Sequence, residues 1–218
     1  MSAPSTHNLP GLPDIAGLKK LCQSLAMLDA VIYPDWQGRY YSFNDGWDDN
    51  VSLASMRDGE GDDYFILFTS AGAVIKGFAH ESVMSPYRTD PPSVWLGILE
   101  DVPAEIKAAL SDPAFSVEDV TYCIWRSKED NGWTCGDITF PPGRDPDGSA
   151  DLLAVLDGNP RSYQVWAEEY YEREIALSAV EHIYNHKPLT DSIIKLLNAE
   201  ITLEDLADDM NEIGYEAP

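Results

Sequence analysis

The sequence predicts an α+β fold, in which an N-terminal helix packs on an antiparallel sheet and further helices follow at the C-terminal end. Turns rich in Asp and Gly at residues 58–63 and 70–72 join strand-like segments, and they are too short to contain the crossover that parallel strands need. From residue 150 onward the apolar residues recur with the helical period instead. Strands and helices segregated along the chain in this way are typical of the α+β class.

The N-terminal part predicts a flexible lead over residues 1–13, which are rich in Ser and Pro, followed by a single domain over residues 14–218. Asp14 is a good N-cap for the first helix, because its carboxylate can accept hydrogen bonds from free backbone N–H groups. Pro34 ends that helix. The apolar positions between them follow the helical period: Ile15, Leu18, Leu21, Cys22, Leu25, Leu28 and Ile32.

The next part of the chain predicts a meander of strands at residues 39–43, 51–57, 64–69 and 73–78. The segment 64–69 is apolar almost throughout, which indicates a strand covered on both faces. The acidic segment 58–63 forms one of the turns, since Asp and Gly accept the backbone conformations of a tight reversal.

A second strand region follows a loop rich in Pro and aromatic residues at 82–102. A helix is predicted at 103–110, with Pro in its first turn. A strand is predicted at 117–126, and the turn Asp130-Asn131-Gly132 leads into a last strand at 133–140. The sheet is therefore expected to come from residues 39–78 and 117–140.

The C-terminal part predicts helices only. One begins at Ala150 and stops at Gly158-Asn159-Pro160. Three more are predicted at residues 162–187, 190–199 and 202–213. For these we expect Ser162 and Thr190 as N-caps, and Thr202 with Asp205 as a capping box that has Asp in place of Glu.

The charge is the strongest compositional feature: 38 Asp and Glu face 14 Lys and Arg, a net charge of −24. Such a field repels nucleic acid, whose binding depends on cations near phosphates, and it favours a basic partner. The lead lacks the basic segment and apolar core of a secretory signal, and no apolar run is long enough for a bilayer. We expect a cytoplasmic protein with no nucleic acid or membrane partner.

The histidines do not form a recognisable catalytic motif. His182 and His186 share a face of a predicted helix, but the Glu that follows the first His in zincins is missing, and these residues are interpreted as exposed or capping side chains. His80 beside Glu81 lacks a nucleophile elbow. We therefore expect no enzyme and no catalytic residue. The alternative is a metal-assisted hydrolase whose site is assembled from distant residues.

Metal and cofactor motifs are also missing from the sequence. The Asp-rich segments 58–63 and 145–151 lack the Gly and Glu that an EF-hand calcium loop needs at its sixth and twelfth positions. No P-loop and no dinucleotide-binding glycine motif occurs. We expect neither a metal nor a cofactor.

What remains is a combination of aromatic and acidic side chains in the predicted meander. Trp47 lies among Asp45, Asp48 and Asp49, and a second acidic group contains Asp62 and Asp63. Aromatic anchors bordered by carboxylates suit recognition of a basic protein surface. These six residues are therefore the predicted partner-binding site. The alternative is that Trp47 belongs to the core and that the acids form a solvated border.

In its size, acidity, α+β order and lack of catalytic motifs, the chain resembles the immunity proteins of bacterial polymorphic toxin systems. The segments 61–68 and 76–82 also resemble signatures of an uncharacterised bacterial group. The first resemblance implies a protein that binds a cognate toxin, often a basic nuclease, and blocks its active site or substrate groove. A protein of halophilic type, acidic because of a high-salt habitat and without a basic partner, is the other interpretation of the same composition.

Overall fold

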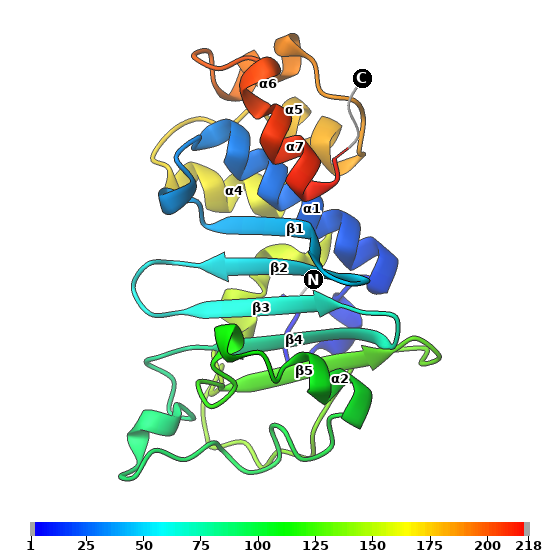
Figure 1. Ribbon diagram of the computed structural model, residues 1–218. Helices are drawn as coiled ribbons and strands as arrows, with labels where there is room; N and C mark the ends of the chain where they lie inside the picture. Colours follow the sequence, from blue (N-terminus) through cyan, green and yellow to red (C-terminus); the bar gives the residue numbers. More distant parts are fainter. Residues whose placement is uncertain (1–2, 216–218) are drawn as a thin grey trace.

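The computed structural model describes residues 3–215 and has the expected α+β class. Six antiparallel strands form one sheet in the order β1-β2-β3-β4-β5-β6, so each strand pairs with its neighbour in sequence (Figure 1). The strands are β1 (Tyr41–Asp48), β2 (Val51–Arg57), β3 (Asp63–Phe68), β4 (Gly72–Phe78), β5 (Tyr122–Ser127) and β6 (Thr134–Cys135).

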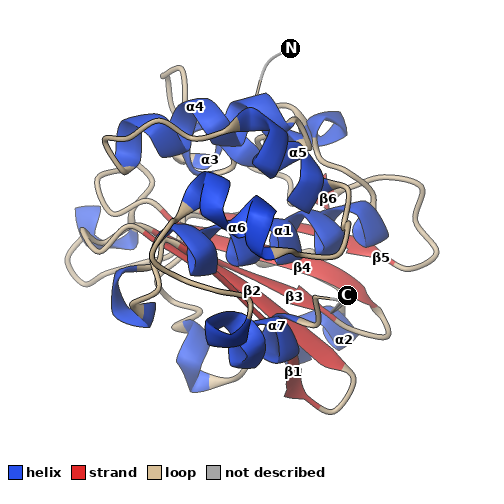
Figure 2. Cartoon of the chain, turned by 90° about the horizontal axis from the view of Figure 1, so that it is seen from above, coloured by secondary structure: helices blue, strands red, loops and turns tan. Residues whose placement is uncertain are grey.

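The helices lie on both faces of this sheet. Figure 2 shows α1, α4 and α5 on one side of the strands and α2 on the other. The α-helices among the described residues are α1 (Ile15–Ile32), α2 (Ala104–Ala109), α3 (Ser149–Leu152), α4 (Pro160–Tyr170), α5 (Leu177–Tyr184), α6 (Asp191–Leu197) and α7 (Ala207–Ile213). Short 3₁₀ helices are η1 (Leu9–Gly11), η2 (Trp36–Gly38), η3 (Pro86–Arg88), η4 (Pro113–Phe115), η5 (Ala154–Asp157) and η6 (Glu204–Leu206).

Two hydrophobic cores result, one on each face of the sheet, because side chains alternate between the faces along a strand. Tyr64 and Ile66 of β3 pack with α1 and the C-terminal helices. Phe65 and Leu67 of the same strand pack with α2 and η4. The prediction that this strand is covered on both faces is confirmed.

The first helix forms as predicted: Asp14 Oδ1 accepts a hydrogen bond of 2.7 Å from the backbone N–H of Gly17. Thr190 caps α6 as expected, by accepting from the backbone N–H of Ile193. Ser162, in contrast, is not an N-cap. Pro160 occupies the first turn of α4, which places Asn159 at the cap, where its side chain accepts from Arg161 N.

The helix expected over residues 162–187 is in fact two helices, α4 and α5, separated by residues 171–176. The polar side chains of α4 bind the backbone of the connecting segment: Gln164 donates to the carbonyl of Ile175 at 2.6 Å, and Glu168 accepts from the N–H of Ile175 at 3.2 Å. The break lets α5 turn back and pack against both α4 and α1. The expected strand at 133–140 is also shorter, since only Thr134–Cys135 pair with β5.

The N-terminal segment differs from the flexible lead expected over residues 1–13, of which residues 1–2 lie outside the described part. Ser5, Thr6 and Leu12 are buried. The hydroxyl of Thr6 donates to Asp147 at 2.6 Å, and the N–H of Thr6 donates to the Ser149 hydroxyl at 3.1 Å. Thr6, one of the residues that suggested mobility, is therefore hydrogen-bonded to the start of α3.

Candidate functional site

The six predicted partner-binding residues occupy two separate places in the fold. Trp47 and its acidic neighbours lie on the β1–β2 hairpin, at the right in Figure 1, whereas Asp62 and Asp63 lie at the β2–β3 turn at the left. Strand β2, which spans seven residues, separates the two turns by about 20 Å, at roughly 3.3 Å per residue. The predicted residues therefore do not form one compact site.

On the hairpin, Asp45 is occupied within the chain. Its carboxylate lies 2.8 Å from the ammonium of Lys19, and this hydrogen bond lowers the pKa of Asp45. Trp47 is 40% exposed, and its ring packs at 6.2 Å from that of Phe115. Trp47 is thus half core and half surface, while Asp48 and Asp49 are exposed.

At the other turn, both predicted carboxylates also have cationic neighbours. Asp63 lies 3.2 Å from the ammonium of Lys76, a fully buried lysine. Asp62 lies 2.6 Å from His80 Nδ1, and this hydrogen bond raises the pKa of His80. The contact of Asp63 with Lys76 has a structural role, because it neutralises a charge inside the sheet.

The structure shows a different group of aromatic side chains beside the acidic β2–β3 turn, which we call the aromatic cleft. It has a volume of about 270 Å³ and lies on the part of the β1–β2 face that α2 does not cover. Ser42 and Ser55, whose hydroxyls are 2.7 Å apart, contribute from the sheet. The other lining residues come from the segment before β1, the end of β2 with the turn that follows it, and α4: Trp36, Gln37, Gly38, Arg39, Tyr40, Arg57, Asp58, Gly59 and Tyr170.

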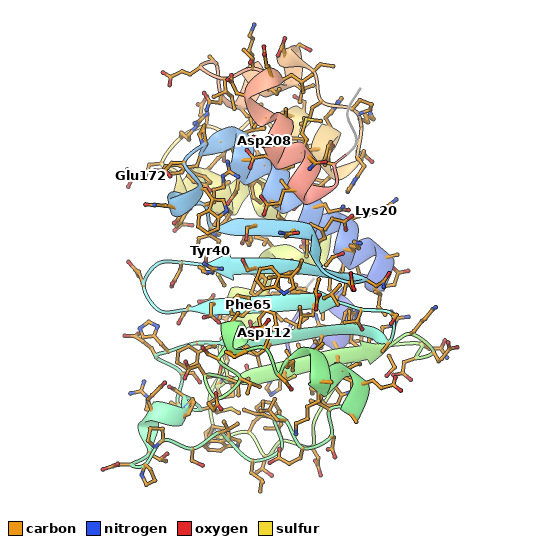
Figure 3. All side chains as sticks on the ribbon, in the orientation of Figure 1. Lys20, Tyr40, Phe65, Asp112, Glu172 and Asp208 are labelled. Carbon is orange, nitrogen blue, oxygen red and sulfur yellow. The ribbon has the colours of Figure 1, made fainter. Side chains whose placement is uncertain are left out.

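Two aromatic side chains of the cleft are about half exposed, and neighbouring rings support Tyr170. Trp36 is 56% exposed and Tyr170 is 43% exposed. The ring of Tyr40, near the left end of β1 in Figure 3, lies 4.9 Å from Tyr170 and 4.7 Å from Trp166. Trp166 in turn stacks on Tyr170 at 5.1 Å, with 15° between the planes. These contacts hold the ring of Tyr170 in a defined position.

Carboxylates of the β2–β3 turn act on the tyrosines of the cleft. Burial raises the pKa of the Tyr40 hydroxyl, and the charges of Asp58 and Asp62 raise it further. Burial also raises the pKa of Tyr170, as do Asp58 and Glu60. One oxygen of Asp58 accepts from the backbone N–H groups of residues 60, 61 and 62 at 2.8, 3.0 and 3.0 Å, so this turn has a fixed conformation.

Two guanidinium groups also line the cleft, and one of them is paired with a carboxylate within the chain. The guanidinium of Arg39 forms a two-pronged ion pair with Asp209 and also donates to the carbonyls of Tyr33 and Pro34. Its charge is therefore compensated within the chain. Arg57 lies over the ring of Phe65, at 5.8 Å from the centroid, on the same face of the sheet.

Behind the cleft, α1 carries a buried carboxylate. Asp29 is fully buried and accepts hydrogen bonds from the backbone N–H groups of Tyr40 and Tyr41, at 3.0 and 2.8 Å, and from the hydroxyl of Tyr163 at 2.9 Å. Burial raises the pKa of Asp29 to about 6, although these hydrogen bonds oppose the rise. Asp29 thus connects α1 and α4 to the start of β1, where the cleft begins.

The histidines considered for catalysis are engaged with backbone groups and a carboxylate. His182 Nε2 lies 2.9 Å from the carbonyl of Pro188, and His186 Nε2 lies 2.8 Å from that of Lys20. These two side chains therefore bind different segments of the chain. The hydroxyl of Ser82, close in sequence to the His80–Asp62 pair, donates to the carbonyl of Pro146 at 2.7 Å. Within residues 3–215, no three His, Cys, Asp or Glu side chains are grouped to hold a metal ion.

Comparisons with known proteins found no matching family model, no matching curated protein and no matching solved structure. None of the helices in the described part of the chain is long and apolar enough to cross a membrane. The site is therefore interpreted from its own geometry.

Sequence reasoning missed the aromatic cleft because its residues come from three separate segments of the chain, 36–42, 55–59 and position 170. A usable signal was present nevertheless. Tyr33, Trp36 and Tyr40 lie in the short segment between the end of the first helix and an edge strand. One side of a small core does not bury so many aromatic side chains, so some of them are expected at the surface.

Proposed function

We propose that this protein is a cytoplasmic acidic protein-binding domain, an immunity-type inhibitor of a basic bacterial toxin. We further propose that the aromatic cleft is the centre of its binding surface. The observation that supports this most directly is the position of Trp36 and Tyr170, which are about half exposed beside the carboxylates of the β2–β3 turn.

The two kinds of side chain have different roles in this proposal. Covering the exposed parts of Trp36 and Tyr170 contributes on the order of 1–2 kcal/mol each, from the apolar area that leaves water. The ring of Tyr170, which neighbouring rings hold in place, also loses little conformational entropy on binding. The carboxylates and the net charge of −24 accelerate the encounter with a basic partner.

The Trp47 hairpin forms a second part of the same proposed surface. Trp47 contacts Phe115, which packs against the same face of the sheet that carries the cleft. A typical interface covers about 800 Å² on each partner, so it extends over roughly 30 Å. One partner can therefore cover both the cleft and the hairpin, with Asp48 and Asp49 at the far border.

The test begins with capture of basic proteins by the full chain from a lysate of the source organism at low salt, repeated at high salt. The binding variants are Trp36→Ala and Tyr170→Ala, and Tyr87→Ala is the matched control, because Tyr87 is 60% exposed on η3 and does not line the cleft. For the charges, Asp48→Asn with Asp49→Asn is compared with the exposed Glu204→Gln.

We expect a basic protein whose capture weakens with salt. The aromatic variants should raise its dissociation rate, the Asp variants should lower its association rate, and both controls should behave as the parent chain. Co-expression should then suppress the toxicity of the captured protein. If capture changes neither with salt nor with these substitutions, the cleft is not the binding surface. If the captured protein is not toxic, the immunity role is excluded. No capture, together with unfolding at low salt, would favour the high-salt interpretation.

A further inference from the structure

A second cavity, which we call the cationic pocket, lies on the opposite face and at the opposite end of the sheet from the aromatic cleft. Its volume is about 590 Å³. It is bounded by the first turn of α1, the β1–β2 and β3–β4 turns and the end of β5, which is the right end of the sheet in Figure 1. None of its lining residues lines the aromatic cleft.

The charge of this pocket is opposite to that of the whole protein. Lys19 of α1, and Arg126 and Lys128 at the end of β5, line it together with a single carboxylate, that of Asp14. In a chain with 14 basic and 38 acidic residues, three cations around one cavity stand out against the overall charge. An anion inside the pocket would meet mainly positive charge.

Of these three cations, Arg126 and Lys128 form no ion pair with a described residue, whereas Lys19 does. Lys19 forms an ion pair with Asp45. Arg126 makes a hydrogen bond of 3.1 Å from Nε to the backbone carbonyl of Asp130, and the ammonium of Lys128 is in no ion pair with any described residue. The guanidinium of Arg126 therefore retains its two terminal NH₂ groups, which suit two-pronged recognition of a carboxylate or phosphate.

The rest of the lining suits a small molecule rather than a bare ion. Phe68, Ile15 and Ala16 supply apolar surface, and polar groups at the mouth come from the turns. The N-terminus of α1 is not the anchor, because Asp14 already caps it. A cavity of this size with an apolar wall and a few converging polar groups is typical of small-ligand sites.

We propose that the cationic pocket binds a small amphiphilic anion. Its carboxylate or phosphate lies between Arg126 and Lys128, and its apolar part lies against Phe68 and Ile15. This binding is independent of the partner proposed for the aromatic cleft, since the two sites share no residue.

The experiment uses the full chain, labelled with ¹⁵N, at moderate salt so that the long-range repulsion of anions by the net charge is screened. The probes are butyrate, butyl phosphate and butylammonium, which share an apolar tail and differ in the charged group. The readout is the backbone amide signals of Asn50 and Gly72, which line the pocket. The variants are Arg126→Gln, Lys128→Gln and the charge-preserving Lys128→Arg. Lys195→Gln on α6 is the matched control, since Lys195 is exposed and distant from the pocket.

We expect saturable shifts with butyrate or butyl phosphate, and the tighter of the two identifies the anionic group. Butylammonium should cause none. Loss of one charged hydrogen-bond donor should weaken binding by about tenfold or more, whereas Lys128→Arg and Lys195→Gln should bind as the parent does. The proposal is overturned if neither anion saturates, if butylammonium shifts the same signals, or if the two Gln variants retain full affinity with well-dispersed spectra.

Discussion

Replacing Asp29 by Asn should remove a gain in stability that the protein acquires at mildly acidic pH. Asp29 is fully buried, and among the described residues it has no cationic partner within ion-pair distance. Its hydrogen bonds come from two backbone N–H groups and the hydroxyl of Tyr163. Burial nevertheless dominates and raises its pKa from 3.8 to about 6.

The sign of this effect is opposite to that of an ordinary paired carboxylate. Because the folded state binds the proton of Asp29 more tightly than the unfolded state, the free energy of unfolding rises as pH falls from about 6 toward 3.8. A pKa increase from 3.8 to about 6 corresponds to about 3 kcal/mol. Above pH 6, Asp29 is charged in the folded state, and the free energy of unfolding is lower by about the same amount than it is when Asp29 is protonated.

The Asn side chain keeps the shape and can still accept from the two backbone N–H groups, but it does not titrate. Urea unfolding of both proteins between pH 7 and pH 4 gives the difference in free energy of unfolding, in which the titration of all other carboxylates cancels. We expect the parent chain to gain about 2 kcal/mol relative to Asp29→Asn as the pH falls through this window, since the full effect is reached only below the unfolded pKa of 3.8. A difference that stays constant, or that changes in the opposite direction, would refute the assignment of a raised pKa to Asp29.

Three further substitutions test the packing and the site. Trp36→Ala should change the free energy of unfolding by no more than about 1 kcal/mol, because the side chain is 56% exposed; a larger loss in urea would mean that Trp36 supports the fold rather than binding. Asp63→Asn should destabilise by about 3 kcal/mol, since it leaves the buried ammonium of Lys76 without its counter-charge; a neutral result would restore Asp63 as a candidate contact. Gly77→Ala should lower the free energy of unfolding by roughly 1–3 kcal/mol, because its new methyl group would lie 2.0 Å from the Tyr122 ring; unchanged thermal unfolding would show that the ring moves freely.

The architecture was predictable because local signals determined it. The short Asp- and Gly-rich turns allowed only antiparallel connections, and the meander follows directly. Asp14 and Thr190 act as N-caps because their side chains have the required reach within one turn of helix.

The errors arose where distant contacts decide the outcome. Nothing in the sequence between residues 162 and 187 breaks a helix, and the break depends on bonds from Gln164 and Glu168 to Ile175. The N-terminal segment is held by Asp147, about 140 positions away in the chain. Its Ser and Thr residues suit a mobile lead and a hydrogen-bonded one equally well, so composition could not distinguish them.

The grouping of the predicted site could have been corrected from the predicted topology. In a meander, consecutive turns lie at opposite ends of the strand that joins them. The β1–β2 hairpin with Trp47 and the β2–β3 turn with Asp62 are consecutive, so they are separated by the length of β2. The aromatic cleft, in contrast, needed the position of α4 against the start of β1, which only the tertiary structure provides.

Salt should act in opposite directions on the two proposed sites. Association of a cationic partner with the aromatic cleft depends on the long-range field of the net charge, so its rate constant should fall as salt rises from about 0.01 M to 0.15 M, where the Debye length shortens from roughly 30 Å to 8 Å. An anion approaching the cationic pocket is repelled by the same field and attracted by Arg126 and Lys128 only at contact distance. Screening removes mainly the distant repulsion, so the association rate of butyl phosphate should rise over the same range. Stopped-flow measurements on the parent chain give both rates. If both association rates fall as salt rises, then an anion is attracted to the cationic pocket even at long range. The positive residues of the pocket, rather than the net negative charge of the protein, would then determine the field there, and the expected opposite effect of salt on the two sites would be wrong.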